Sequence, residues 1–195
     1  MGTLTARPNR DALRLIVAGP VTLVSSMHRG QPNVMTAAWH MPISLSPTLI
    51  SVAIHPARLT HTFVSASEQF VVNIPTVDLI GPVHHAGMIT GRDIDKFATV
   101  GLEPEESTVV EAPRVTGCAA YIECQVRDRS AMGDHDLFVA DIVSVIADDE
   151  SFDGHWNVET DAGRLLHHLG ADRYAELARS YRARLPDDED EESTG

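Results

Sequence analysis

The chain has 195 residues, of which 43% are hydrophobic and 22% charged, the balance of a single globular domain rather than of a disordered or membrane-embedded chain. With a formal net charge of −13, it lacks the basic surface that phosphate backbones require, which disfavours a nucleic-acid partner. No stretch approaches the roughly 20 apolar residues of a membrane span, and the first residues lack the apolar core of a signal peptide, so we expect a cytoplasmic protein without a membrane partner.

Short strands are predicted along the first three quarters of the chain. Runs rich in apolar and β-branched residues occur at 21–27, 33–39, 48–54, 69–74, 118–126 and 137–147, with turn-forming residues between them. Gly133 in GDHD (133–136) predicts a hairpin turn between the last two runs. Helical spacing of apolar residues predicts helices at about 60–68, 76–87 and, most strongly, 160–184, where Gly170 is expected to interrupt the helix. This pattern favours a small β-barrel with helical additions.

The two ends of the chain differ from the middle in composition. We divide the chain into a flexible arm at 1–12, one domain at 13–184 and an acidic tail at 185–195. The run DDEDEE (187–192) supplies six of the negative charges. Because such a segment has almost no apolar surface to bury, we expect a solvated, disordered terminus.

Several familiar kinds of site are disfavoured by spacing. The adjacent pairs His84–His85 and His167–His168 would point about 100° apart on a helix, and there is no CxxC or HExxH, so we expect no metal centre. Cys118 and Cys124 would lie roughly 20 Å apart on one strand, which predicts two reduced, buried thiols. Neither a GxSxG elbow nor a glycine-rich phosphate loop is present.

The stretch HPARLTH (55–61) remains, at the point where the apolar run 48–54 ends. Arg58 offers a planar fork suited to phosphate oxygens, Thr60 a hydroxyl donor, and the helix that follows free N–H groups. Upstream, the small residues of 36–38 would let a flat ligand lie against the backbone beside Trp39. The residues alone leave two alternatives open, an anion site or a solvated turn with a surface arginine.

The order of several motifs carries a family resemblance. GPVTLVSS, NVMTAAWHMPISLSP, HPARLTHTF, EQFVVNIP, GRDIDKF, GDHDLFVADI and HHLGADRYAELA follow one another across about residues 15 to 182. This combination resembles the flavin reductase-like family, with one departure, since Ala140 stands where the family pattern LFVGEV has glycine. The resemblance implies a six-stranded antiparallel split β-barrel that binds FMN, and a homodimer with the flavin at the subunit interface, to which helix 160–184 contributes.

The resemblance also implies roles for individual residues. Met35–Trp39 line the isoalloxazine ring with Ser44 close by, and HPARLTH holds the flavin phosphate. Lys96 is a basic residue near the cofactor, or else a surface charge that caps a helix. His135 orients the nicotinamide or donates a proton, or else bonds locally with a neighbouring aspartate. The implied cofactor-binding residues are Met35, Thr36, Ala37, Ala38, Trp39, Ser44, His55, Arg58, Thr60, His61 and Lys96, and the implied catalytic residue is His135.

The activity that the resemblance implies is hydride transfer from NADH or NADPH to N5 of FMN, with FAD as an alternative cofactor. Reduced flavin would pass to a monooxygenase partner, to ferric iron or to oxygen. Two other functions stay open at this point. The chain would be an FMN carrier or sensor without reductase activity, or a split-barrel enzyme that acts on a pyridoxine-type or haem-derived substrate.

Overall fold

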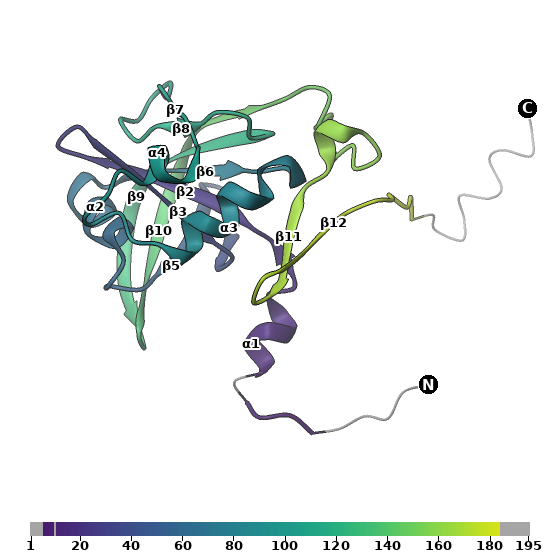
Figure 1. Cartoon of the computed structure of the whole chain (residues 1–195), viewed down its shortest axis with the longest axis horizontal. Coiled ribbons are helices and arrows are strands. Elements are labelled where there is room, and N and C mark those ends of the chain that lie inside the picture. The colour runs from purple at the N-terminus through teal and green to yellow at the C-terminus, as the bar shows by residue number, and fades with distance from the viewer. Residues whose placement is uncertain (1–5, 10, 184–195) are drawn as a thin grey trace, which may run out of the picture.

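A computed structural model describes residues 6–9 and 11–183, and its main body is one antiparallel sheet of seven strands in the order β3-β2-β6-β9-β10-β5-β4 (Figure 1). The strands are β2 (Thr22–His28), β3 (Gln31–Ala37), β4 (His40–Leu45), β5 (Thr48–Ile54), β6 (Gln69–Ile74), β9 (Ala120–Met132) and β10 (His135–Ala147). The prediction of a mainly β chain with a few helices is confirmed. The sheet has seven strands rather than six, because β4 adds to the edge beside β5. Its Pro42 is typical of an edge strand and hid this strand from the sequence pattern.

The hairpin of β9 and β10 brings one end of β10 to the functional region. Met132 pairs with His135 across the tight turn predicted at 133–136, and Gly133 has the positive φ of 67° that this turn requires. Since Asp136 pairs with Ile54, His135 lies next to the end of β5. Ala140, the departure from the family pattern, is fully buried in the sheet core.

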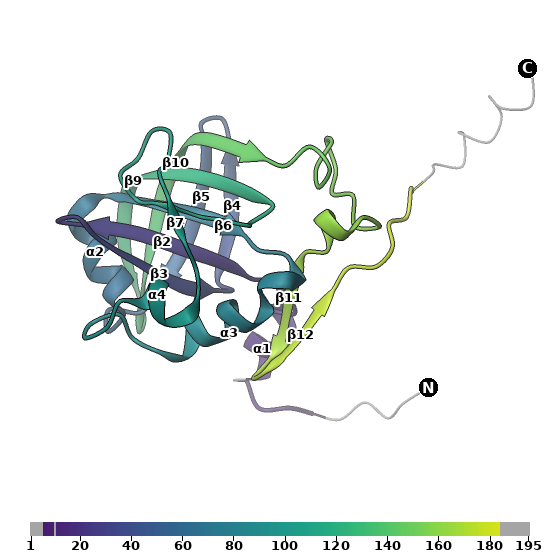
Figure 2. The same cartoon turned by 45° about the horizontal axis from the view of Figure 1, so that its top comes forward.

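The helices cover the sheet and its edges. They are α1 (Asp11–Ile16), α2 (Leu59–Ser67), α3 (Ile80–Met88) and α4 (Lys96–Val100), with short 3-10 turns η1 (Val77–Leu79) and η2 (Asp161–Gly163). The predictions at about 60–68 and 76–87 are confirmed as α2 and as η1 with α3. Figure 2 shows α3 and α4 next to β3, against which both pack. Over the described part of the chain, no helix combines the length and the apolar character that crossing a membrane needs.

The prediction of a helix at 160–184 is wrong. The segment forms a hairpin of β11 (Leu166–Gly170) and β12 (Arg173–Glu176), and β1 (Gly19–Pro20) extends it to a three-stranded sheet. Gly170 and Ala171 both have positive φ, so they turn the chain back where a helix would continue. Long-range pairing of β11 with β1 therefore overrides the local helical spacing. The acidic tail predicted at 185–195 lies outside the described residues.

A loop covers part of the sheet at β6 and β9. The strands β7 (Pro104–Glu105) and β8 (Arg114–Val115) flank it, and Val110 and Ala112 pack on Val71. Beneath the loop, Glu123 is 1% exposed and accepts hydrogen bonds from the backbone N–H groups of Thr108, Val109 and Val110. A polar position of β9 is thus buried but fully paired.

Candidate functional site

Two adjoining cavities lie between β3, the end of β5 and α3. The larger encloses about 300 Å³ and the smaller about 240 Å³. Met35, Thr36, His55 and Arg58 line both, so the cavities are two lobes of one space, which we call the β3 cleft. β3 is an edge strand of the sheet, and alternate backbone N–H groups along it therefore face away from β2 without a partner strand.

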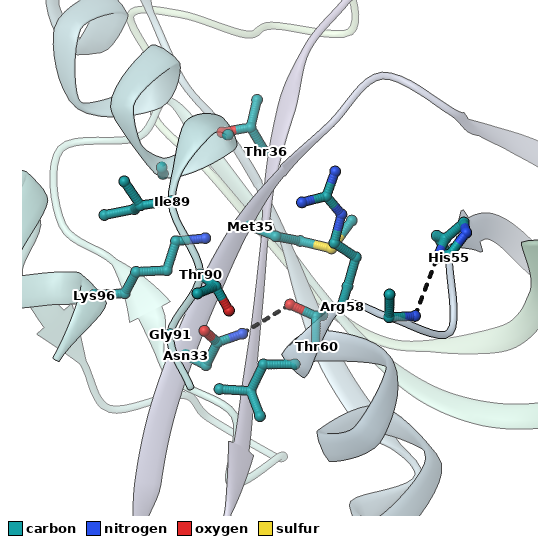
Figure 3. A pocket seen from close by; sticks show the side chains of 14 residues that line it. Asn33, Met35, Thr36, His55, Arg58, Thr60, Ile89, Thr90, Gly91 and Lys96 are labelled. Atoms are coloured by element: carbon teal, nitrogen blue, oxygen red, sulfur yellow. Dashed lines mark hydrogen bonds between the residues drawn. The ribbon is translucent and has the colours of Figure 1, made fainter. Parts of the chain in front are cut away.

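The larger lobe contains the start of α2. Arg58 is the residue before the helix and has extended backbone angles. Its side chain makes no capping hydrogen bond to the helix and extends into the cleft (Figure 3). Thr60 is 1% exposed and accepts a 2.7 Å hydrogen bond from Nδ2 of Asn33, which leaves its own hydroxyl proton free to donate. The first N–H groups of a helix have no intrahelical partner and attract anions. Arg58, Thr60 and the helix start thus present donors to the same lobe.

Lys96 lies on the opposite wall. It begins α4, and Asp95 caps that helix by accepting a hydrogen bond from Ala98 N–H at 3.1 Å. Only 5% of Lys96 is exposed, and Figure 3 shows its side chain extended into the lobe. Burial, and then repulsion from Arg58, lower the pKa of Lys96 to about 8. Among the described residues, no carboxylate forms an ion pair with Lys96 or Arg58.

Two buried polar features support the same lobe. Oδ1 of Asn33 is buried and has no hydrogen-bond partner within the described chain. It lies so close to Gly91 that a Cβ atom at that position would clash with it. The absence of a side chain at Gly91 therefore lets the segment after α3 approach Asn33 and close the lobe.

The smaller lobe is lined by small and aromatic groups. Ala37, Ala38 and Trp39 form one side, and the ring of His135 lies 4.8 Å from that of Trp39, centroid to centroid. His55 packs edge-on against His135 at 5.2 Å. A flat ligand in this lobe would meet the backbone of β3 on one side and these rings on the other.

The two histidines have defined hydrogen bonds. Nδ1 of His55 accepts a hydrogen bond from the backbone N–H of Ala57 at 3.0 Å, which places the proton of the neutral ring on Nε2. Nδ1 of His135 lies 2.7 Å from Oδ1 of Asp134. This hydrogen bond from His135 lowers the pKa of Asp134, so the carboxylate orients the His135 ring while Nε2 remains available.

The structure does not bring every predicted residue to the cleft. Nε2 of His61 lies 2.8 Å from Oδ2 of Asp136, and the His61 ring packs on Phe138, so the side chain points away from the lobes. Ser44 lies on β4, opposite Leu49 of β5, outside the residues that line the cleft. The other predicted residues all line it, namely Met35, Thr36, Ala37, Ala38, Trp39, His55, Arg58, Thr60, Lys96 and His135.

Sequence reasoning missed part of the larger lobe. Asn33, Ala86, Gly87 and the segment 89–91 line it. Asn33 gave no signal beyond its place in a predicted strand, and Ala86 and Gly87 lie on a helix that was predicted without a role. The arrangement depends on α3 packing against β3, a long-range contact that local patterns do not reveal.

Other reactive groups are remote from this chemistry. Cys118 and Cys124 are free and buried, and burial raises the pKa of both thiols to about 12, so neither is a nucleophile at neutral pH. In the part of the chain that the structure describes, no three histidine, cysteine or acidic side chains gather as metal ligands do.

Residues 13–176 match the family model described as the flavin reductase like domain. The chain belongs to this family. Among its relatives, an uncharacterized protein of Archaeoglobus fulgidus is 40% identical over 124 residues, which cover 64% of this chain and 70% of that one. The reductase component of 4-nitrophenol 4-monooxygenase/4-nitrocatechol 2-monooxygenase from Rhodococcus opacus is 28% identical over 130 residues, 67% of this chain and 66% of that one.

A solved structure agrees with this assignment. The FMN-binding domain of a flavin reductases-like enzyme from Shewanella baltica OS155 superimposes with a TM-score of 0.77 at 29% identity, covering 92% of this chain and 97% of that one. In the present flavin reductase-like chain, the β3 cleft combines a cationic lobe with a flat, aromatic one. Such a pair of lobes is suited to a ligand with a ring system at one end and an anionic group at the other.

Proposed function

We propose that this chain binds FMN in the β3 cleft and transfers hydride to it from NADH or NADPH. The observation that carries this proposal is the meeting of Arg58 and Lys96 in one lobe, where the described chain provides no carboxylate for either. A buried ammonium beside a guanidinium is unfavourable until an anion joins them. The phosphate of FMN, with close to two negative charges, supplies that anion.

The larger lobe provides the phosphate contacts in this proposal. Arg58 donates to two phosphate oxygens, the hydroxyl of Thr60 and the N–H groups at the start of α2 donate to the others, and Lys96 approaches from the opposite wall. Ser44 and His61 are left out of the set because their side chains lie outside the cleft.

The smaller lobe takes the isoalloxazine ring. The small residues of 36–38 allow the ring to lie on β3, and outward N–H groups of this edge strand stabilise negative charge at the N1–C2=O edge of the reduced ring. When bound, FMN would supply the ring that accepts the hydride, and the proton that accompanies the hydride would come from solvent. His135, held by Asp134, orients the nicotinamide over the ring or delivers that proton.

An anaerobic visible spectrum tests this function. The protein is incubated with FMN, and spectra are recorded before and after addition of NADH and then NADPH. We expect the bound flavin to bleach with at least one donor. A bound flavin that stays oxidised with both would contradict the reductase and favour a carrier, whereas absence of FMN binding would contradict the site itself.

We further propose a homodimer, in which the edge strand β4 takes part. Met41, Ile43 and Leu45 of this strand are 56%, 41% and 92% exposed, and β4 has no neighbour on its outer side among the described strands. An unpaired edge with exposed apolar side chains is typical of a contact surface.

The homologous reductase component of Rhodococcus opacus supports a monooxygenase as recipient of reduced flavin. The free cysteines support a cytoplasmic location.

A further inference from the structure

Lys96 is the only lysine of the chain, and its amine has a reactivity that hydride transfer does not use. The side chain is 5% exposed, so a reagent reaches it only through the β3 cleft, whose larger lobe it lines. Arg58 and Thr60 line the same lobe, which means that any molecule bound to them by an anionic group is held in the same small space as Nζ (Figure 3).

Two physical effects turn a lysine into a nucleophile, namely desolvation and a neighbouring cation, because both disfavour the protonated amine. Lys96 has both. Burial and Arg58 lower its pKa to about 8. Before an anion binds beside Arg58, about a quarter of such amines are neutral at pH 7.5, against about one in a thousand for a lysine with its ordinary pKa. Among the described residues, no carboxylate forms an ion pair with Lys96 that would raise its pKa again.

We propose that Lys96 captures small phosphorylated aldehydes as an imine in the β3 cleft, in competition with FMN. This inference rests on the proposed function for the phosphate contacts of Arg58 and Thr60. The neutral amine adds to the carbonyl carbon, and the carbonyl oxygen leaves as water with the two protons of the nitrogen. A C=N bond thus replaces the C=O bond, nothing is oxidised or reduced, and hydrolysis reverses the step.

The test uses glyceraldehyde 3-phosphate, with glyceraldehyde as the matched aldehyde that lacks the phosphate. Each is incubated with the protein and sodium cyanoborohydride, which reduces an imine to a stable secondary amine, and peptide mass mapping locates the label. The N-terminal α-amino group is the only other primary amine, so it serves as an internal reference. We expect the phosphorylated aldehyde to label Lys96 at least tenfold faster than the N-terminus, and FMN to slow this labelling.

Two variants sharpen the result. Lys96→Arg keeps the positive charge but removes the primary amine, so it should lose the internal label. Arg58→Ala should slow the labelling of Lys96, because it removes both the phosphate anchor and the neighbouring cation. Labelling confined to the N-terminus, or equal rates at Lys96 with both aldehydes, would overturn the proposal.

An FMN titration of the same preparation separates this inference from the proposed function. Binding of FMN without selective labelling of Lys96 would overturn the capture site alone. Selective labelling of Lys96 in a protein that does not bind FMN would support the capture site and contradict the flavin function.

Discussion

Lys96 combines a cost to the fold with a use in binding. Its folded pKa of about 8 lies below the ordinary value of 10.5, so the folded chain holds this proton less tightly than the unfolded chain. The charged side chain therefore destabilises the fold below pH 8, and this penalty shrinks as the pH rises from about 8 toward 10.5. Sites that bind charged ligands often show such an opposition between stability and function.

We predict that Lys96→Met stabilises the ligand-free protein and weakens FMN binding. At pH 7 the free energy of unfolding should rise by about 1 to 3 kcal/mol, since each unit of pKa shift corresponds to about 1.4 kcal/mol. FMN affinity should fall at least tenfold. Urea denaturation and FMN fluorescence titration measure the two quantities, and a variant that is less stable than the parent would contradict the view of Lys96 as an unpaired buried cation.

The role of His135 depends on its ring, which packs near Trp39 and forms a hydrogen bond with Asp134. We predict that His135→Ala retains FMN binding but oxidises NAD(P)H at least about a hundredfold more slowly, which is the low end of what a positioned acid or base contributes. Steady-state rates across pH 6 to 9 provide the measurement. Unchanged rates with an unchanged pH profile would show that His135 has no catalytic role.

At the scale of elements, the loop between β7 and β8 is held to β9 by one carboxylate. Burial alone would raise the pKa of Glu123, but the three backbone N–H donors outweigh it and lower the pKa below its usual value. Glu123 therefore stabilises the fold above the ordinary pKa of a glutamate, and this contribution is lost as the pH falls through its lowered folded value.

We predict that Glu123→Gln lowers the free energy of unfolding by about 2 to 4 kcal/mol at pH 7. The substitution removes hydrogen bonds to a charged acceptor, and the NH2 group of the glutamine would face backbone N–H groups, which are also donors. FMN binding should persist, since the loop lies apart from the cleft residues. The exposed Glu106 gives the control, and Glu106→Gln should leave stability unchanged. Equal denaturant midpoints for the two variants would refute this account.

The sequence predicted elements where local and long-range preferences agree. The strands, α2 and α3 followed from alternation and helical spacing, and the hairpin turn followed from Gly133. The segment 160–184 failed because its leucines satisfy helical spacing while Gly170 and the pairing with β1 impose a hairpin. β4 was missed because Pro42 and its edge position weaken the strand pattern.

The candidate site was partly predictable for the same reason. Arg58 and Thr60 follow a strand and begin a helix, so their types and spacing already made an anion site one of two alternatives, beside a solvated turn. The spacing also predicted His61 as a member of this site, but its side chain turns toward Asp136 on β10. The burial of Lys96 against the same lobe results from α4 packing on β3, a contact that no local pattern shows.

At the scale of the whole molecule, the exposed apolar residues are not confined to the segment first expected to form the subunit contact. That segment contains the β11–β12 hairpin and exposes Leu169, Leu177 and Tyr181, while β4 exposes Met41, Ile43 and Leu45. Helix α1 adds Leu15 and Ile16, which are 74% and 79% exposed. On β4 these side chains lie along an unpaired strand edge, which is the reason that the proposed dimer contact is placed there.

We predict that Ile43→Lys converts the proposed dimer to a monomer with little change in the denaturant midpoint of the isolated chain. A lysine on an edge strand opposes edge-to-edge association. Val109→Lys, which changes another exposed apolar residue on the distant loop, should leave the dimer intact. Light scattering during size-exclusion chromatography distinguishes the species, and a wild-type chain that elutes as a monomer would contradict the dimer.

The phosphate site is the centre of the account, and one comparison tests it most directly. FMN and riboflavin, which differ only in the phosphate, are titrated into the wild-type protein and into Arg58→Ala. We predict that the substitution weakens FMN by about 1.5 to 3 kcal/mol, the scale of a charge-assisted hydrogen bond, and leaves riboflavin nearly unchanged. Equal losses for the two ligands would contradict the assignment of Arg58 to the flavin phosphate.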